Sequence, residues 1–213
     1  MFTSRTLQEG KCPIVVLAAF GVATLVWCPV TWASILPLAL LTFTISFFRD
    51  PERTIPAGER AIVSPADGRV VDVRTLNEPH FLKADAQMVA IFLSVFDVHV
   101  QRAPIAGDMK LAQYNRGQFL DARKAESTRL NENRVVGIEG ADGFRVTVKQ
   151  IAGLIARRIV GWAGEGARLT KGERIGMIRF GSRVELYVPK ECEIVAKVGE
   201  YAKGGETVLA RRR

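Results

Sequence analysis

A run of residues without any charged side chain extends from Pro13 to Phe48. It is longer than the roughly 20 apolar residues that one membrane-crossing helix needs. In the middle of the run, in the stretch CPVTW, Pro29 lacks the N–H group that a helix requires and restricts the residue before it. The pattern therefore predicts two short apolar helices, at about 13 to 28 and 32 to 48, which form a hairpin.

Basic residues flank this hairpin on both sides, with Arg5 and Lys11 before it and Arg49 and Arg53 after it. The bias of Lys and Arg toward the cytoplasm predicts that both ends lie on the cytoplasmic side of a membrane. We expect a membrane anchor at the cytoplasmic face of the cell membrane. Whether the hairpin crosses the bilayer or dips into it stays open at this stage. The alternative is a buried helical pair in a soluble core, which a domain of this size would cover with difficulty.

After the anchor, apolar and polar residues alternate in short runs. The run RVELYVP places Val184, Leu186 and Val188 on one face and Glu185 and Tyr187 on the other. Such alternation predicts half-buried strands, and turn residues separate several of these runs. The expected fold class is mainly β, a barrel-sandwich-like domain with repeats similar to those of carrier domains.

The chain is therefore predicted to contain an anchoring hairpin at 1–48, a linker at 49–60 and a β-rich domain at 61–213. Residues 116–135, RGQFLDARKAESTRLNENRV, show no clear period and many polar side chains. We interpret them as a long loop with a short helix, and loops of this length are often lids.

Two segments, GARLTKGERI and GEYAKGGETV, repeat the same glycine spacing. Gly166 and Gly172 in the first correspond to Gly199 and Gly205 in the second, 33 residues later. The unit resembles the turn and strand of biotinyl and lipoyl carrier domains. Neither copy has the residues that surround a modified lysine, so we interpret the repeat as structural.

The formal net charge is +8, from 30 Lys and Arg against 22 Asp and Glu. We attribute this excess to attraction to an anionic membrane surface and expect no nucleic-acid partner. Three scattered cysteines, Cys12, Cys28 and Cys192, form no CxxC pair, which favours a reducing compartment. With two histidines in the chain and no cysteine near either, we expect no metal site.

Three short stretches contain residues for an activated nucleophile. They are SPADGRV with Asp67, FLSVFDVHVQRAP with Asp97 and His99 on one face of a predicted strand, and FGSR with Ser182. A serine hydroxyl becomes nucleophilic when an imidazole takes its proton and a carboxylate orients that imidazole. Each stretch alone is ordinary, because Asp-Gly and Gly-Ser pairs are common in turns. Their spacing does not show whether the three side chains meet.

Taken in order, several stretches resemble the short prokaryotic phosphatidylserine decarboxylases. The matching stretches are FFRDPER, SPADGRV, FDVHVQRAP, GLIARRIV and RIGMIRFGSRVELYVP. Longer family members read Leu-Gly-Ser-Thr at the processing site, whereas this chain has Phe180-Gly181-Ser182-Arg183. The Gly-Ser pair is kept, and FGSR is similar to the short members.

The resemblance implies that the chain is a zymogen that cleaves itself between Gly181 and Ser182. Ser182 would attack the carbonyl of Gly181, which has no side chain to obstruct the approach. The resulting ester would break by β-elimination, and the dehydroalanine at position 182 would hydrolyse to a pyruvoyl group. His99 would be the base, and Asp67 would orient it. The products would be a large chain, 1–181, and a small chain, 182–213, which form a heterodimer.

The resemblance also implies a reaction of phospholipid biosynthesis. The pyruvoyl group would form a Schiff base with phosphatidylserine and accept the electrons released as carbon dioxide leaves. His99 is the candidate donor that reprotonates Cα, and the product would be phosphatidylethanolamine. Arg157, Arg158 or Arg183 could bind the lipid phosphate or carboxylate, the alternative being that they form a solvated face.

Three other functions stay open from the residues alone. A Ser-His-Asp lipid hydrolase would keep Ser182 intact, but the chain lacks a GxSxG nucleophile elbow. A membrane-tethered β-domain could act as a binding module without catalysis. A decarboxylase could also act on another head group or on an ether lipid, which this sequence does not distinguish from a diacyl lipid.

Overall fold

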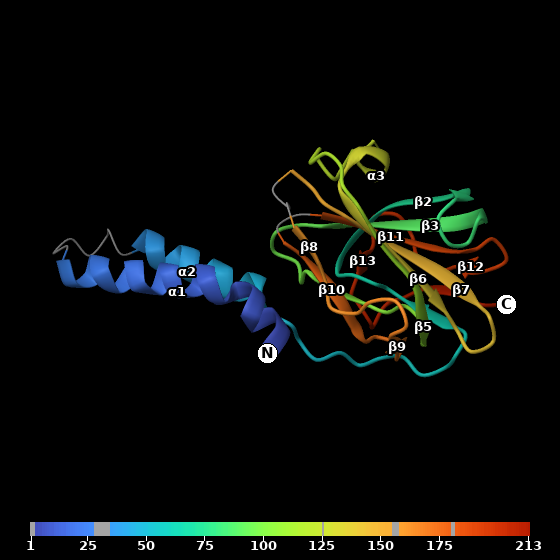
Figure 1. The fold of residues 1–213 in the computed structure, drawn as a ribbon, viewed down its shortest axis with the longest axis horizontal. Coiled ribbons are helices and arrows are strands. Elements are labelled where there is room, and N and C mark those ends of the chain that lie inside the picture. The colour runs from blue at the N-terminus through green and yellow to red at the C-terminus, as the bar shows by residue number, and fades with distance from the viewer. Residues whose placement is uncertain (1–2, 28–34, 125, 155–157, 180–181) are drawn as a thin grey trace. The chain divides into compact units, whose positions relative to one another are not determined.

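The computed structural model spans residues 1–213 and describes all of them except 1–2, 28–34, 125, 155–157 and 180–181 (Figure 1). Pro29, Arg157, Phe180 and Gly181, which the sequence singles out, therefore lie outside the described residues. The chain forms two compact units, Met1–Glu52 and Arg53–Arg213. We describe each unit by itself.

The first unit contains two helices, α1 (Ser4–Trp27) and α2 (Ile35–Phe47), which pack against each other. Both predicted helices are present, but α1 begins at Ser4 rather than near 13. Pro13 lies inside α1 although proline has no backbone N–H, so the helix does not begin at this proline. Among the described residues, neither helix combines the length and apolar character needed to cross a bilayer. The membrane role of the hairpin stays a prediction.

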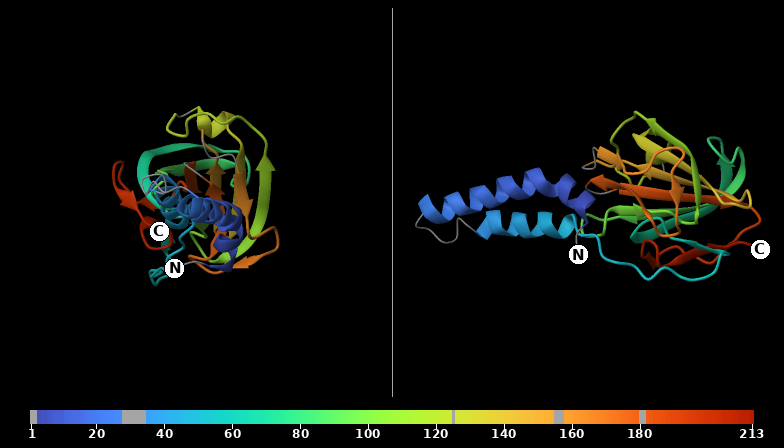
Figure 2. Two further views of the ribbon diagram at one scale, coloured as in Figure 1. Left: turned by 90° about the vertical axis from the view of Figure 1, so that its left-hand side faces the viewer. Right: turned by 60° about the horizontal axis from the view of Figure 1, so that its bottom comes forward.

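The second unit is mainly β, as predicted, and its largest part is an antiparallel sheet of eight strands. The sheet curls around an interior, so that it resembles half of a barrel (Figure 2). In spatial order its strands are β13 (Tyr201–Ala202), β2 (Gly68–Glu78), β3 (Ala84–Leu93), β11 (Ser182–Pro189), β7 (Arg145–Ile151), β6 (Asn133–Glu139), β5 (Gly107–Asn115) and β9 (Arg168–Leu169).

Two sheets of three strands complete this unit. One contains β4 (Val100–Arg102), β10 (Arg174–Arg179) and β8 (Arg158–Gly161), and the other contains β1 (Ala61–Val63), β14 (Val208–Arg211) and β12 (Glu193–Ile194). The predicted long loop between β5 and β6 contains one short helix, α3 (Ser127–Leu130). This agrees with the sequence-based interpretation of that segment.

Strand β11 is buried on both faces. The predicted apolar face, Val184, Leu186 and Val188, lies in the main core with no exposed surface. The other face was expected to be only partly buried, yet Glu185 is fully buried and Tyr187 is 5% exposed. The reason is that Thr128 of the β5–β6 loop lies against Glu185, while Tyr187 packs in a second small core with Leu76 and Leu82.

One row of paired residues crosses seven of the eight strands at one end of the sheet. The row consists of Tyr201, Arg69, Phe92, Arg183, Ile151, Asn133 and Asn115, each paired with the next. Ser182 is next to Arg183 in the chain, so we call this end of the sheet the Ser182 end. The hairpin tips around 79–83 and 140–144 lie at the opposite end of their strands.

The repeat seen in the sequence is also present in the structure. Gly166, Gly172, Gly199 and Gly205 have φ angles of 86°, 81°, 94° and 82°, a left-handed region that favours glycine. In each copy a short strand, β9 or β13, precedes the second glycine. β9 pairs with β5 and β13 pairs with β2, and both of these long strands start at a glycine. The two copies therefore occupy equivalent places in the sheet.

A second pair of segments shares this symmetry, Val63–Gly68 before β2 and Arg102–Gly107 before β5. The backbone N–H of Arg102 donates to the Pro65 carbonyl at 2.8 Å, and that of Val63 donates to the Pro104 carbonyl at 3.0 Å. Where the first copy has Asp67, the second has Ala106. The domain is thus internally duplicated around the turn that contains the predicted catalytic carboxylate.

Candidate active site

Ser182 is the first residue of β11, a strand paired with β3 on one side and β7 on the other. Its register partner on β3 is Leu93. The residue is fully buried, and its Oγ has no hydrogen-bond partner among the described residues. An unpaired buried hydroxyl costs free energy, so this serine does not serve the stability of the fold.

His99 lies just before β4, in the loop that follows β3. The sequence predicted Asp97 and His99 on one face of a strand, but β3 ends at Leu93 and β4 begins at Val100. The chain leaves the strand because the Asp97 carboxylate accepts a hydrogen bond from the Ser94 N–H at 2.7 Å, which closes a turn. The alternating valines nearby gave the misleading strand pattern.

The His99 imidazole is fully buried and its tautomer follows from one contact. Its Nδ1 lies 2.9 Å from the Asp97 carbonyl oxygen. Because a carbonyl can only accept, Nδ1 carries the proton, and the lone pair of a neutral ring is then on Nε2. In its neutral form His99 would therefore present Nε2 as the atom that can accept a proton.

The backbone of His99 is attached to the strand that leads to Ser182. Ile178 on β10 donates its N–H to the His99 carbonyl at 3.2 Å, and the Gln101 side chain donates to the same oxygen at 2.8 Å. Three residues separate Ile178 from Ser182 along the chain. The fold thus brings the predicted base and the predicted cleavage site into one region.

Asp67 lies on the turn before β2, and its side chain is 7% exposed. Nη2 of Arg53 donates to both carboxylate oxygens, at 2.9 and 2.8 Å, and the Gly204 N–H donates to Oδ1 at 2.8 Å. Burial raises the pKa of Asp67, while Arg53 and Gly204 oppose that rise. The described contacts of this carboxylate are to Arg53 and Gly204, so its predicted role of orienting His99 stays a prediction.

Two residues at this site were not predicted from the sequence. Arg53 was interpreted as a charge flanking the anchor, and Tyr201 was not singled out. The Tyr201 hydroxyl donates to Oδ1 of Asp97 at 2.7 Å and ties the loop before His99 to β13. The FFRDPER stretch, which contributes to the family resemblance, is the signal that could have identified Arg53.

The three predicted lipid-binding arginines differ in their surroundings. Arg157 lies outside the described residues, and Arg158 is exposed at the start of β8. Arg183 is 2% exposed, and its Nε donates to Glu185 at 2.7 Å. An arginine in a buried ion pair is not part of a solvated face, which was the alternative considered for it.

A hollow of about 240 Å³ lies beside the start of β11. Its apolar lining comes from the end of β3 and the loops that follow β3, β5 and β7, namely Phe92, Leu93, Val95, Ala122 and Leu154. Leu93 is the register partner of Ser182. Ser182 itself does not line the hollow, which reaches the candidate nucleophile only through Leu93, its neighbour on β3.

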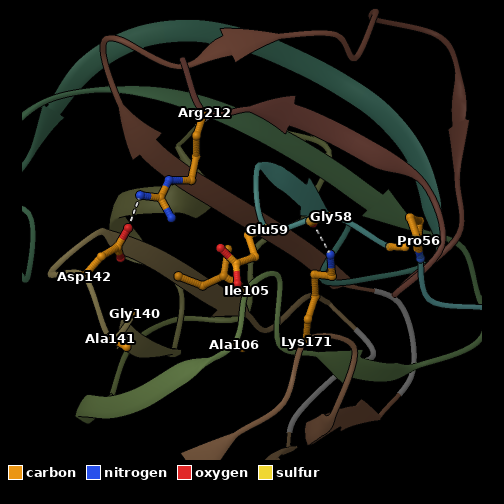
Figure 3. A pocket seen from close by; sticks show the side chains of 11 residues that line it. Pro56, Gly58, Glu59, Ile105, Ala106, Gly140, Ala141, Asp142, Lys171 and Arg212 are labelled. Atoms are coloured by element: carbon orange, nitrogen blue, oxygen red, sulfur yellow. Dashed lines mark hydrogen bonds and ion pairs between the residues drawn. The ribbon is translucent and has the colours of Figure 1, made fainter.

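A larger hollow, of about 420 Å³, lies elsewhere (Figure 3). Asp142 of the β6–β7 hairpin lines it and pairs with Arg212. Lys171, between β9 and β10, also lines it and donates to the Gly58 carbonyl at 2.7 Å. None of Ser182, His99 and Asp67 lines it. The described residues contain no cluster of His, Cys, Asp and Glu suited to a metal ion.

The family model for phosphatidylserine decarboxylase matches residues 40–210. A phosphatidylserine decarboxylase proenzyme of Carboxydothermus hydrogenoformans is 45% identical over 92% of this chain and 92% of its own length. The proenzymes of Symbiobacterium thermophilum and Geobacter sulfurreducens are 44% and 45% identical, over 96% and 95% of this chain and 94% and 98% of their own. The chain belongs to the phosphatidylserine decarboxylase family.

Proposed function

We propose that the chain converts phosphatidylserine to phosphatidylethanolamine with a pyruvoyl group that it makes from Ser182. The observation that carries this proposal is the buried Ser182 Oγ, which has no hydrogen-bond partner among the described residues. Family membership and the proenzyme names of the relatives support it. A pyruvoyl group fits the position, because no contact in the described part of the chain depends on that hydroxyl.

In the proposed self-cleavage, Nε2 of His99 takes the proton of the Ser182 hydroxyl. Oγ bonds to the Gly181 carbonyl carbon as the C–N bond breaks, which leaves an ester and a free amine at position 182. Loss of the proton at Cα of position 182 forms a Cα=Cβ double bond and breaks the Cβ–Oγ bond, giving a Gly181 carboxylate and dehydroalanine. Addition of water and loss of ammonia then give the pyruvoyl group.

The pyruvoyl group supplies an electron sink for the carbon–carbon bond that breaks when carbon dioxide leaves. The residues of this chain do the rest. His99 returns a proton to Cα of the substrate from its buried position. The apolar hollow beside Leu93 excludes water from that part of the site, and a cationic side chain such as Arg158 binds the lipid phosphate.

Cleavage would leave the two chains in one sheet. Residues 182–213 include β11, which is paired on both sides with strands of the large chain, β3 and β7. They also include β13 and β14, which pair with β2 and β1. We therefore propose a heterodimer whose chains separate only on denaturation.

We propose that Met1–Glu52 attaches the enzyme to the cytoplasmic face of the cell membrane, where a lipid substrate lies. Large apolar side chains are exposed on both helices, among them Val16 at 65%, Phe20 at 59% and Leu36 at 67%. Exposed apolar surface of this kind marks a site of contact with lipid or with another protein.

The test is the intact mass of the purified chain, run on a denaturing gel beside Ser182→Ala. The wild type should give two fragments, 1–181 and 182–213, and the second should have a blocked amino end. Before denaturation the same protein should decarboxylate phosphatidylserine. Ser182→Ala should stay whole and inactive. A wild-type chain that stays whole with a free Ser182 hydroxyl would contradict the proposal and favour a hydrolase or a binding module.

A further inference from the structure

We propose that the Ser182 end of the sheet is itself a docking surface for an anionic lipid bilayer, into which Phe96 and Leu154 insert. This proposal rests on the proposed lipid decarboxylase function and adds a second membrane contact, on the unit Arg53–Arg213. It concerns that unit alone.

The exposed apolar side chains of this unit are not spread evenly. Among its described residues, the large hydrophobic side chains that are exposed are Val71, Phe96, Tyr114, Leu154, Val198 and Tyr201. Every one of them belongs to the paired row at the Ser182 end or lies within four residues of a row member along the chain. Single exposed apolar residues are normal on a soluble protein, but their concentration at one end is not.

Large apolar side chains at the opposite end of the sheet are covered instead. Phe81, at the β2–β3 hairpin, lies against Gly137 and under the Arg145 guanidinium, 5.5 Å from the ring centroid. Phe144, at the β6–β7 hairpin, has the Arg212 guanidinium 4.1 Å from its ring centroid. The described residues therefore present an apolar surface at the Ser182 end and a polar one at the hairpin end.

Phe96 and Leu154 are the most exposed of these side chains, at 72% and 63%. Phe96 follows directly after Val95, and Val95 and Leu154 both line the apolar hollow beside Leu93, the register partner of Ser182. A lipid that leaves a bilayer between these two side chains would enter the hollow with its acyl chains on apolar surface. The docking surface thus connects the bilayer with the proposed reaction site.

The net charge of the β5–β6 loop, part of which lines the hollow beside Leu93, and of Arg158 favours an anionic bilayer over a neutral one. The β5–β6 loop has four basic side chains, Arg116, Arg123, Lys124 and Arg129, against three acidic ones, Asp121, Glu126 and Glu132. Arg123 pairs with Asp121, and exposed Arg158 adds a further positive charge. Basic residues near a membrane surface are attracted to anionic lipids.

The test places tryptophan at the proposed contact in the full chain, reconstituted into vesicles of phosphatidylglycerol and phosphatidylcholine with brominated acyl chains. Phe96→Trp and Leu154→Trp each add one fluorophore to the three native tryptophans. Their added fluorescence should be quenched by the bromine atoms. Ala141→Trp is the matched control at the exposed β6–β7 tip, and its added fluorescence should not be quenched.

Equal quenching at positions 96 and 141, or none at 96, would overturn the proposal. Quenching needs no catalysis, so a chain that docks but never cleaves at Ser182 would contradict the proposed function and still support the docking surface. A second measurement compares Phe96→Ser with the wild type on vesicles and on monomeric short-chain phosphatidylserine. The ratio of the two rates should fall about tenfold, and an unchanged ratio would overturn the proposal.

Discussion

Arg53 donates two hydrogen bonds from one nitrogen, Nη2, to both oxygens of the Asp67 carboxylate, and both side chains are buried, with 6% and 7% exposed. Arg53 is the first residue of the second unit. The segment that follows the helical hairpin therefore contributes a charge to the candidate active site. Loss of either partner would leave a buried charge without compensation.

Arg53→Ala should destabilise the chain by about 3–5 kcal/mol, because the Asp67 carboxylate then keeps only Gly204 as a donor. Self-cleavage should also slow if Asp67 acts through His99. Denaturant unfolding in a Ser182→Ala background and a gel time course in the wild type measure the two effects. Arg74→Ala removes a surface pair with 46% and 31% of the side chains exposed, and should change stability by less than about 1 kcal/mol. Equal effects of the two variants would contradict this prediction.

Gln101 belongs to a buried chain of hydrogen bonds that ends at His99. Arg134 donates to Gln150 at 3.1 Å, Gln150 donates to Gln101 at 2.8 Å, and Gln101 donates to the His99 carbonyl at 2.8 Å. Gln101→Met keeps the volume but leaves the buried Gln150 Nε2 without its acceptor and the His99 carbonyl with one donor instead of two, so it should cost about 1–3 kcal/mol.

The same variant should slow self-cleavage, because the His99 backbone loses one of its two fixed donors. Melting curves and a cleavage time course give the two readouts. The control is Gln113→Met, an exposed glutamine that bonds Asn115 at 2.8 Å. Should both variants cleave at the wild-type rate, Gln101 would be a residue of the core without influence on His99.

Glu185 is a buried acceptor for three donors on β11 and the β5–β6 loop. Arg183 Nε, the Tyr187 hydroxyl and the Thr128 hydroxyl donate to it at 2.7, 2.6 and 2.6 Å. Glu185→Leu should destabilise the chain by about 3–5 kcal/mol, since the buried Arg183 loses its close partner. Unfolding in a Ser182→Ala background measures this loss.

Glu139→Leu provides the comparison, because the Arg145–Glu139 pair is at the surface, with 52% and 23% of the side chains exposed. Its removal should cost less than about 1 kcal/mol. A small loss at Glu185 would show that Arg183 finds water or another acceptor when its partner is removed.

His80 should titrate below its ordinary value, because burial and then Lys149 lower its pKa from 6.5. The unfolded chain binds the proton more tightly, so stability from this residue is present above pH about 6.5 and lost as the pH falls toward the folded pKa. Proton NMR resolves the two histidines, and His80→Gln identifies the signal. A His80 signal that titrates above 6.5 would contradict the prediction.

The sequence predicted the elements better than the contacts between them. Alternation located the buried face of β11, and glycine spacing located the repeat. Alternation failed between Leu93 and Val100, because a side-chain bond from Asp97 decided where the strand ended. Periodicity contains no signal for such a bond.

The candidate site shows the same limit. Asp67, His99 and Ser182 could be selected from motifs, but the partners of Asp67 could not. Arg53 is 14 residues from Asp67 in sequence and Gly204 is 137 residues away. Charge pattern alone assigned Arg53 to the membrane flank, because a basic residue after an apolar run looks the same in sequence whether or not it pairs with a distant carboxylate. Only the folded chain shows which acid that is.

The paired turns at Pro65 and Pro104 have the same backbone frame but different chemistry. The prolines and the glycines that open β2 and β5 are shared by both turns, so they belong to the backbone frame. Asp67 and Ala106 occupy corresponding positions, so only the first turn has a charge there. An Ala106→Asp variant would place a carboxylate at the corresponding position of the second turn, away from Arg53. It would show whether the turn alone accommodates the charge or whether Arg53 is needed as well.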